Sequence, residues 1–387
     1  MQSNVLLMTA DRAVTAAVSR ALSSNGHVVT SVAQDQEELL RQLAANPSVI
    51  ALVDLDPSPA NALAQLERLA GRFPGARFVA LAGTVAAELL QDAMQAGVRR
   101  VIAKQSMETE LQGVLNRLSP GESRGAEAPR GDVITILQAA GGCGATTIAA
   151  NLAAELAAAQ PPQASAATVV IDLDCCYGAL TTYFGLAPLY AMDHLLHYER
   201  ALDAELIRST ATIAGPQLHL LASPASTQGY RPQSPDLSRL SEVINVASRT
   251  YRCTVIDAPR LPAEAVAALV SASTHVLLVF QLMVKDVRLA RAMLDWLDVL
   301  GIPRRHVIPV ANRYARRSPI SVNDAAMVLG GGVTVRCLRS DFATASEGAN
   351  FGKTIAQVAP RSPFRKDLQE LMTSLTPSRA SHQGTAG

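Results

Sequence analysis

Apolar and polar positions in the first third of the chain follow two alternating patterns. Short apolar runs, typical of buried parallel strands, are separated by longer segments whose apolar residues recur every three or four positions, as on one face of a helix. The predicted strands are Val5–Met8, Val28–Val32, Ile50–Asp54, Phe78–Leu81 and Arg100–Ile102. The predicted helices are Asp11–Ser23, Asp35–Ala45, Ala60–Phe73, Val85–Ala96 and Glu108–Leu118. Five strand–helix steps predict a doubly wound, flavodoxin-like α/β domain.

The periodic pattern stops at residues 119–132, where glycine, proline, serine and charged residues replace it. We interpret this segment as a linker between a first domain, residues 1–118, and a second domain, residues 133–375. Residues 376–387 are small and polar, and we expect a flexible tail there. The strands predicted for the second domain are Val133–Leu137, Thr168–Asp174, Cys253–Pro259, His275–Phe280 and Val307–Arg313. The sequence therefore predicts two doubly wound α/β domains.

Composition excludes several classes of protein. The net charge is +1 and charged residues make up 17% of the chain, so no overall field attracts it to nucleic acid or anionic lipid. No apolar run approaches the length of about 18 residues that a membrane span needs, and the first residues lack the pattern of a signal peptide. Five cysteines without a CxxC pair indicate thiols in a reducing compartment. We expect a cytoplasmic protein without disulfides or a zinc site.

A glycine-rich loop follows the predicted strand Val133–Leu137 and precedes an alanine-rich helical segment. It reads Ala140-Gly141-Gly142-Cys143-Gly144-Ala145-Thr146-Thr147. Glycines let backbone N–H groups curl around phosphate oxygens, and a helix N-terminus favours negative charge. A hydroxyl at Thr146 suits Mg²⁺, but the preceding position, where a lysine usually reaches the β- and γ-phosphates, is Ala145. The loop keeps a scaffold for phosphate without the main catalytic charge.

This loop resembles the deviant Walker A motif of the ParA/MinD ATPases, K-G-G-x-G-K-[ST]-[ST]. Both lysine positions are alanine here, Ala140 and Ala145. The run G-A-T-T is similar to the CpaE/TadZ branch of that family, the localisation factors of Flp-type (tad) pilus assembly. In the family the first lysine reaches across a nucleotide-sandwich dimer, and Ala140 cannot make that contact.

Two predicted strands end in acids that match the same family. Asp174 matches the switch I aspartate that orients the attacking water, and Asp172 lies two residues earlier on the same strand face. A helix cap is the alternative role for Asp174. Asp257 matches the Walker B aspartate, so the resemblance implies a magnesium site at Thr146 and Asp257. For Arg260, close to this acid, we favour a solvated surface arginine over a substitute for the missing lysines.

The strand Val307–Arg313 ends in Asn312-Arg313, which resembles the base-recognising pair of the family. Asparagine offers both a donor and an acceptor to an adenine edge. The alternative role for Asn312 is that of a turn residue at the end of the strand. Residues 339–341 and 347–353 resemble the P-N-D and A-x-N-x-G-K segments of the family. The resemblance implies that the loop residues Gly141 to Thr147, with Asn312 and Arg313, bind ATP or ADP with Mg²⁺.

The first domain resembles a response-regulator receiver. Asp54 closes the strand IALVD at the place of the phosphoacceptor, and Lys104 matches the lysine of receivers. The acids expected for magnesium are replaced by Thr9 and Ala10, and the expected Ser/Thr after the fourth strand is Ala82. Because Mg²⁺ then has too few hard oxygen ligands, we favour a pseudo-receiver for docking or dimerisation over a phosphorylatable domain.

Two groups of side chains have a structural and a functional interpretation. Five arginines predict a local basic cluster, and we favour a solvated face over DNA contact, because DNA affinity needs several contacts together; they are Arg304, Arg305, Arg313, Arg316 and Arg317. A helical apolar stripe near the end of the chain predicts core packing rather than a MinD-like membrane anchor; it consists of Phe364, Leu368, Leu371, Met372 and Leu375.

The resemblance implies a localisation and assembly factor for a Flp-type (tad) pilus or a related secretion machine. The chain would act as a homodimeric scaffold with little or no catalysis, at the cell pole or the inner face of the inner membrane. Implied partners are the pilus secretion ATPase and other tad components, with no specific nucleic acid and at most peripheral membrane contact. The alternatives are a ParA-like ATPase that partitions DNA or cargo, disfavoured by Ala140 and Ala145, and a phosphorylation-controlled regulator, supported only by Asp54 and Lys104.

Overall fold

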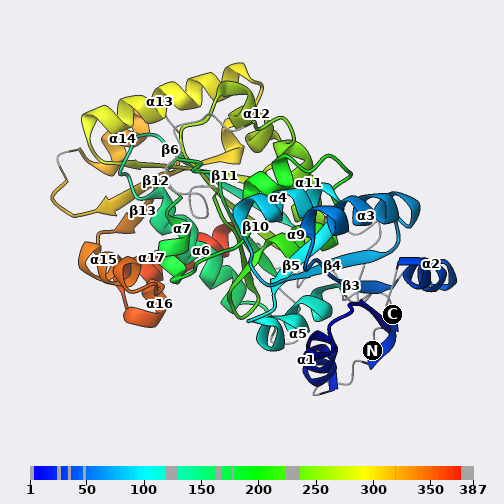
Figure 1. Ribbon diagram of the computed structural model, residues 1–387. Helices are drawn as coiled ribbons and strands as arrows, with labels where there is room; N and C mark the ends of the chain where they lie inside the picture. Colours follow the sequence, from blue (N-terminus) through cyan, green and yellow to red (C-terminus); the bar gives the residue numbers. More distant parts are fainter. Residues whose placement is uncertain are drawn as a thin grey trace, which may run out of the picture. The chain divides into compact units, whose positions relative to one another are not determined.

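The computed structural model describes residues 4–23, 28–33, 36–46, 49–118, 130–161, 167–176, 178–223, 236–318, 320–330 and 332–375. The chain forms two compact units, whose elements are labelled in Figure 1. The first unit comprises Met1–Glu127 and His197–Thr210, and the second comprises Ala128–Leu196 and Ala211–Gly387. Residues 119–129 of the predicted linker and the whole predicted tail lie outside the described residues.

The first unit is built on a five-stranded parallel sheet in the order β2-β1-β3-β4-β5. Its strands are β1 (Asn4–Met8), β2 (Val28–Ala33), β3 (Ile50–Asp54), β4 (Arg77–Ala82) and β5 (Val98–Ala103). The helices between and after them are α1 (Arg12–Ser23), α2 (Gln36–Ala45), α3 (Pro59–Arg72), α4 (Ala87–Gln95) and α5 (Met107–Leu118). The predicted parallel α/β fold is confirmed here, and the element ends differ from the predictions by two residues at most; Asp35 lies outside the described residues.

Apolar burial on both faces explains why the strands of the first unit could be recognised. Every residue of β3 is buried, as expected of a central parallel strand covered by helices on both sides. Helix α3 buries Leu63, Leu66 and Leu69, which recur at helical spacing. Pro59 stands at its first turn, where the missing N–H costs no hydrogen bond.

A segment far along the sequence, residues 197–210, belongs to the first unit. It contains α9 (Ala204–Thr210), which packs against β5 and α5. Arg99 pairs with Asp203 through two hydrogen bonds of 2.7 and 3.3 Å. The sequence did not indicate this arrangement, because the segment lies within residues 133–375 and an ion pair between distant positions leaves no periodic signal.

The second unit contains, within the described residues, an eight-stranded sheet in the order β13-β12-β11-β6-β10-β7-β9-β8. All neighbours are parallel except β8 and β9. The strands are β6 (Asp132–Gln138), β7 (Thr168–Asp172), β8 (Thr212–Gly215), β9 (Leu218–Leu221), β10 (Cys253–Ala258), β11 (His275–Gln281), β12 (Val307–Tyr314) and β13 (Arg336–Arg339). The five predicted strands are among them.

The helices of the second unit cover this sheet. They are α6 (Ala145–Ala158), α7 (Leu180–Phe184), α8 (Met192–Leu196), α11 (Leu240–Thr250), α12 (Ala263–Ala272), α13 (Val284–Val299), α14 (Val322–Leu329), α15 (Phe342–Asn350), α16 (Ile355–Val358) and α17 (Pro363–Leu375), with a 3₁₀ turn η1 (Arg304–His306). Strand β6 lies between β10 and β11, so the chain leaves the centre of the sheet in both directions. Ligands of such sheets bind at the carboxyl ends of the central strands.

Helix α17 closes the core of the second unit against α6 and β13, and Figure 1 shows α15 and α16 in the same region. Its apolar stripe is buried, which confirms the predicted core packing; the buried residues are Phe364, Leu368, Leu371 and Leu375. Glu155 of α6 accepts hydrogen bonds from Arg365 and Gln369 of α17. Nowhere in the described part of the chain is a helix long and apolar enough to cross a membrane.

Candidate functional site

The glycine-rich loop joins β6 to α6 and faces open space. Gly142 and Gly144 have φ angles of +77° and +92°, the left-handed region that favours glycine. A Cβ atom added at Gly141 or Gly142 would meet no atom within 4 Å. Helix α6 begins at Ala145, so the partial positive charge of its N-terminus lies at the end of the loop. This geometry fits a phosphate group held by backbone N–H groups.

Two side chains from neighbouring strands hold the loop. Asn312, on β12, donates from Nδ2 to the carbonyl oxygen of Cys143 at 2.8 Å. Gln281, the last residue of β11, donates from Nε2 to the carbonyl oxygen of Gly142 at 3.1 Å. A side chain at Gly144 would collide with the Asn312 amide. Asn312, predicted to recognise a base, thus positions the loop through its amide nitrogen, and Gln281 is a positioning residue that the sequence did not reveal.

The loop carries no cationic side chain at either lysine position. Ala140 and Ala145 are 2% and 5% exposed, so both methyl groups pack into the protein. Cys143 is fully buried, and burial raises the pKa of its thiol, so this side chain adds no charge to the loop. Arg260 is exposed between β10 and α12, as expected of a solvated surface arginine.

Asp257 and Thr146 lie together, as the proposed metal site requires. Asp257 is the penultimate residue of β10, is buried, and accepts a hydrogen bond from the Thr146 side chain. Burial raises the pKa of Asp257 to about 6; the Thr146 hydrogen bond opposes this shift and the charge of Asp174 adds to it. A hydroxyl and one carboxylate are hard oxygen ligands, which suit a Mg²⁺ ion that also keeps waters and phosphate oxygens.

Asp172 ends β7, so the predicted extension of this strand to Asp174 is wrong. Both carboxylate oxygens of Asp172 accept backbone N–H groups, from Asp174 at 3.0 Å and from Leu180 at 3.1 Å. Leu173 still donates its N–H to the carbonyl oxygen of Asp257 on β10 at 3.1 Å, and the regular strand ends before it. Burial, with the charge of Asp257, raises the pKa of Asp172 to about 8. Asp174 is partly exposed beyond the strand, where a catalytic or capping role remains a prediction.

The carboxylates do not form a complete metal site by themselves. Across residues 4–375, apart from the short gaps in the description, no three His, Cys, Asp or Glu side chains converge in a way that could hold a metal ion. Magnesium at Thr146 and Asp257 would therefore depend on phosphate oxygens for its remaining ligands. The donor set fits a metal that arrives with a nucleotide.

A cavity of about 230 Å³ lies beside the loop, between β12, α7 and the region of α15. Gly144 and Thr147 line it from the loop, and Asn312 and Arg313 line it from β12. The Arg313 guanidinium lies over the Phe342 ring, 5.6 Å from its centroid. An aromatic ring, guanidinium groups and an amide are suitable neighbours for a purine base.

The remaining segments predicted for the site also reach this cavity. Arg339 and Asp341 line it after β13, and Asn350 lines it from α15. Tyr183 of α7 lines it too, and its hydroxyl lies 2.7 Å from Thr147 Oγ1. Tyr183 was not predicted, because a tyrosine within a short helix has no motif that distinguishes it from a core residue.

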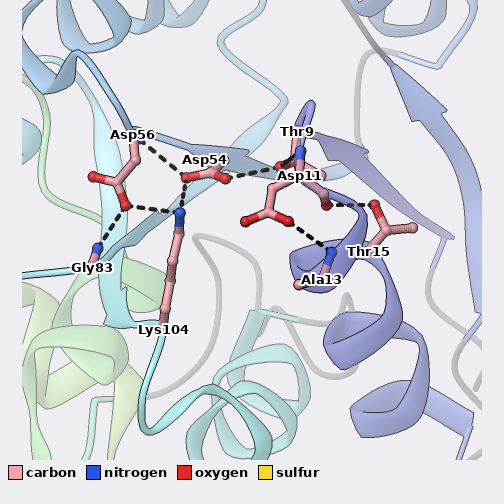
Figure 2. Close-up of polar contacts among 8 residues, drawn as sticks. All are labelled: Thr9, Asp11, Ala13, Thr15, Asp54, Asp56, Gly83 and Lys104. Atoms are coloured by element: carbon pink, nitrogen blue, oxygen red, sulfur yellow. Dashed lines mark hydrogen bonds and ion pairs between the residues drawn. The ribbon is translucent and has the colours of Figure 1, made fainter.

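In the first unit, Asp54 is enclosed by its neighbours at the carboxyl end of β3 (Figure 2). Thr9 Oγ1 donates to Asp54 Oδ2 at 2.8 Å. Lys104 Nζ lies 2.7 Å from Oδ1, and the backbone N–H of Asp56 donates to the same oxygen at 3.1 Å. Both oxygens of this buried carboxylate are therefore engaged within the protein.

Lys104 acts as a built-in cation in this pocket. Its Nζ also lies 2.8 Å from Asp56 Oδ2, which accepts the backbone N–H of Gly83 at 2.9 Å (Figure 2). Burial lowers the pKa of Lys104, but its hydrogen bonds to Asp54 and Asp56 outweigh this effect and raise the pKa above its ordinary value. Asp11 instead accepts the backbone N–H of Ala13 at the start of α1. The arrangement favours the pseudo-receiver interpretation.

We predict that Asp54 takes no phosphoryl group. Incubation with acetyl phosphate and Mg²⁺ should leave the intact mass unchanged, because Thr9 and Ala10 stand where acids for the metal are expected, Thr9 donates to the Asp54 carboxylate, and Asp56 is paired with Lys104. The Asp54→Asn variant serves as the control. A single-phosphate adduct that is present in the wild type and absent from this variant would contradict the prediction.

The predicted local basic cluster is wrong. Arg304 and Arg305 precede β12, whereas Arg313, Arg316 and Arg317 lie at or after its end. At about 3.3 Å per residue, the strand separates the two groups by about 25 Å. Arg304 is also paired with two aspartates, Asp295 and Asp298.

Binding to random duplex DNA should accordingly be weak, with a dissociation constant above about 1 µM at physiological salt and a shallow salt dependence. Each phosphate contact contributes about −0.9 to the slope of log K against log salt, and the separated arginines allow few simultaneous contacts. Fluorescence anisotropy across a salt series measures both quantities. Submicromolar affinity with a steep slope would support the partition alternative.

No protein-family model matches the sequence, and no curated protein matches it. Solved structures do match. A ParA family ATPase from Chlorobium tepidum TLS is 21% identical, with a TM-score of 0.55 over 62% of this chain and 98% of that chain. The septum site-determining protein MinD with Mg-ADP from Pyrococcus horikoshii OT3 is 18% identical, with a TM-score of 0.51 over 64% and 96%.

The MinC:MinD cell division protein complex from Aquifex aeolicus also contains a similar chain, 19% identical, with a TM-score of 0.50 over 64% of this chain and 98% of that chain. These matches cover 62–64% of the chain, and only the second unit is large enough to account for that length. At such low identity the likeness shows the fold alone. The second unit therefore has the P-loop fold seen in ParA and MinD ATPases.

Proposed function

We propose that this chain is a CpaE/TadZ-type localisation and assembly factor for a Flp-type (tad) pilus or a related secretion machine. It acts as a homodimeric scaffold at the cytoplasmic side of the inner membrane or at the cell pole. Its partners are the pilus secretion ATPase and other tad components. The observation that carries the proposal is an open phosphate cradle in which both lysine positions, Ala140 and Ala145, are buried alanines.

A scaffold role is compatible with the fold of the second unit. The similar chain from Aquifex aeolicus belongs to a MinC:MinD complex, and the one from Pyrococcus horikoshii carries Mg-ADP. The fold thus supports both partner binding and nucleotide binding in other proteins. This chain lacks the lysine charges that hydrolysis needs, but it keeps the glycine-rich loop to which a nucleotide could bind.

The residues of this chain fit Mg-ATP or Mg-ADP as a ligand. The N–H groups of the loop would hold phosphates, Thr146 and Asp257 would hold the metal, and Arg313 with Phe342 would flank the base. Bound nucleotide would supply the negative charge that neutralises the helix N-terminus. Asn312 fixes the loop in advance, so nucleotide would bind without rebuilding it.

The first unit serves docking or dimerisation in this proposal. Its acceptor aspartate is held by Thr9 and Lys104, which favours a fixed surface over a phosphorylation switch. Residues 197–210 already cover part of β5 and α5.

Complementation tests the proposal. A strain of the source organism that lacks this gene should lose its pili, and the Asp174→Ala variant should restore them as well as the wild type does, because a scaffold needs no activated water. As the control, the variant and the wild type should reach equal levels in the cell, and both units of the variant should show thermal unfolding like that of the wild type. If folded Asp174→Ala protein fails to restore pili, hydrolysis is required. If deletion spares pili and disturbs plasmid or chromosome inheritance, the partition alternative holds.

A further inference from the structure

Negative charge gathers at the end of the loop that faces the proposed metal site. In phosphate-binding loops the residue before the hydroxyl reaches the β- and γ-phosphates, so Ala145 and Thr146 mark that end here. Asp257 accepts a hydrogen bond from Thr146, and Asp172 is its register partner on the adjacent strand β7. Asp174 follows two residues later. Burial raises the pKa of Asp172 to about 8 and so favours its neutral form at pH 7. The negative charge next to the place of the outer phosphates is therefore that of Asp257 and Asp174, and the loop has no lysine to oppose it.

The arginines of the site lie at the cavity instead. Arg313 and Arg339 line it together with Asp341, whereas Thr146, Asp172, Asp174 and Asp257 do not. Arg313 lies over Phe342, and Arg339 is paired with Asp367 at 2.6 Å. Arg313 therefore places its cation beside the proposed position of the base. The neighbouring charges that act on Asp172 and Asp257 are those of other aspartates.

We propose that this site binds a nucleoside diphosphate at least as tightly as the triphosphate, so that the protein does not distinguish ATP from ADP in favour of ATP. The inference rests on the nucleotide binding included in the proposed function. The first two phosphates gain the N–H groups of the loop and the dipole of α6. The third phosphate brings further negative charge toward Asp257 and Asp174, and the lysine positions that would receive it are Ala140 and Ala145. ATP and ADP would then hold the scaffold in the same state.

Isothermal titration of the full chain with adenosine, AMP, ADP and ATP, each with Mg²⁺, tests this inference. Affinity should rise from adenosine to ADP and should not rise further with ATP. The titrated samples are checked for hydrolysis by chromatography. If ATP binds more tightly than ADP by about tenfold or more, the inference is overturned. It is also overturned if none of the four compounds binds.

Three variants test whether residues at the loop determine the ratio of ATP to ADP affinity. Ala145→Lys should shift the ratio of ATP to ADP affinity toward ATP by about tenfold or more, because a charge-assisted hydrogen bond to the outer phosphate is regained. Ala343→Lys adds the same charge at an exposed position of α15 outside the cavity lining and should leave the ratio unchanged. Asp174→Asn should move the ratio toward ATP several-fold and covers the case in which Ala145→Lys does not fold. An unchanged ratio in folded Ala145→Lys or, failing that, in Asp174→Asn would overturn the inference.

Failure of this inference differs from failure of the scaffold proposal. ATP-selective binding combined with full restoration of pili by Asp174→Ala would overturn the inference alone. Diphosphate binding as expected, combined with loss of pili in Asp174→Ala, would overturn the scaffold proposal alone.

Discussion

With Mg-ATP, the purified protein is expected to turn over no faster than its Asp257→Ala variant. Removing one preorganised donor to a developing charge costs on the order of 100-fold to 1,000-fold in rate. Two lysine positions are alanine here, so independent losses would amount to about 10,000-fold or more. Ala140 and Ala145 are buried, and Arg260 is exposed between β10 and α12. Steady-state phosphate release at saturating ATP is the measurement.

The double variant Ala140→Lys with Ala145→Lys is the matched gain-of-function test. It should bind nucleotide more tightly than the wild type, because the loop backbone and the Thr146–Asp257 contact are already in place. Wild-type turnover at rates typical of ParA or MinD, abolished in Asp174→Ala, would contradict the prediction. Arg260→Ala would then show whether that arginine replaces the lysines.

Features with a strong local signal were predictable from the sequence. The bounds of β3 agree to the residue, because a run of five buried residues ends at the charged Asp54. The glycine-rich loop was recognisable because its positive φ angles require glycine, which leaves a visible pattern. Packing of the α17 stripe also followed from helical spacing alone.

Features that depend on distant contacts were not predictable. Asp174 was assigned to a strand because the apolar run continues through Leu173, yet the carboxylate of Asp172 accepts backbone N–H groups and ends the strand. The five arginines were taken as one cluster because they are close in sequence, but an extended strand separates positions efficiently. Gln281 holds the loop from another strand, a role that no single-sequence pattern reveals.

The same distinction applies to the two candidate sites. The sequence predicted which carboxyl groups stand at strand ends, because such acids interrupt apolar runs. It could not predict that Thr9 donates to Asp54, or that Lys104 bridges two aspartates. Those contacts matter for the chemistry of the first unit, because they engage both oxygens of the Asp54 carboxylate within the chain. The missing lysines of the second unit, by contrast, were visible at once, because an absence at a motif position needs no tertiary information.

The largest expected effect on stability is at Leu368, in the middle of α17. Leu368→Ala should lower the free energy of unfolding of the second unit by about 2–5 kcal/mol, because a fully buried leucine loses its contacts and leaves a cavity. Lys366→Ala, on the exposed side of the same helix, should change it by less than about 0.5 kcal/mol. Trp296, the single tryptophan of the chain, lies on α13 of the second unit and reports its unfolding in a denaturant titration.

The outcome also separates core packing from the membrane-anchor alternative for this helix. An amphipathic anchor would have to release its apolar face, and the Glu155 contacts with Arg365 and Gln369 on α17 would be lost with it. Release would thus separate Glu155 from both partners and expose the buried apolar stripe to water, and both effects oppose release. A stability change in Leu368→Ala as small as that in Lys366→Ala, together with weaker binding to anionic vesicles, would show that the stripe serves a membrane rather than the core.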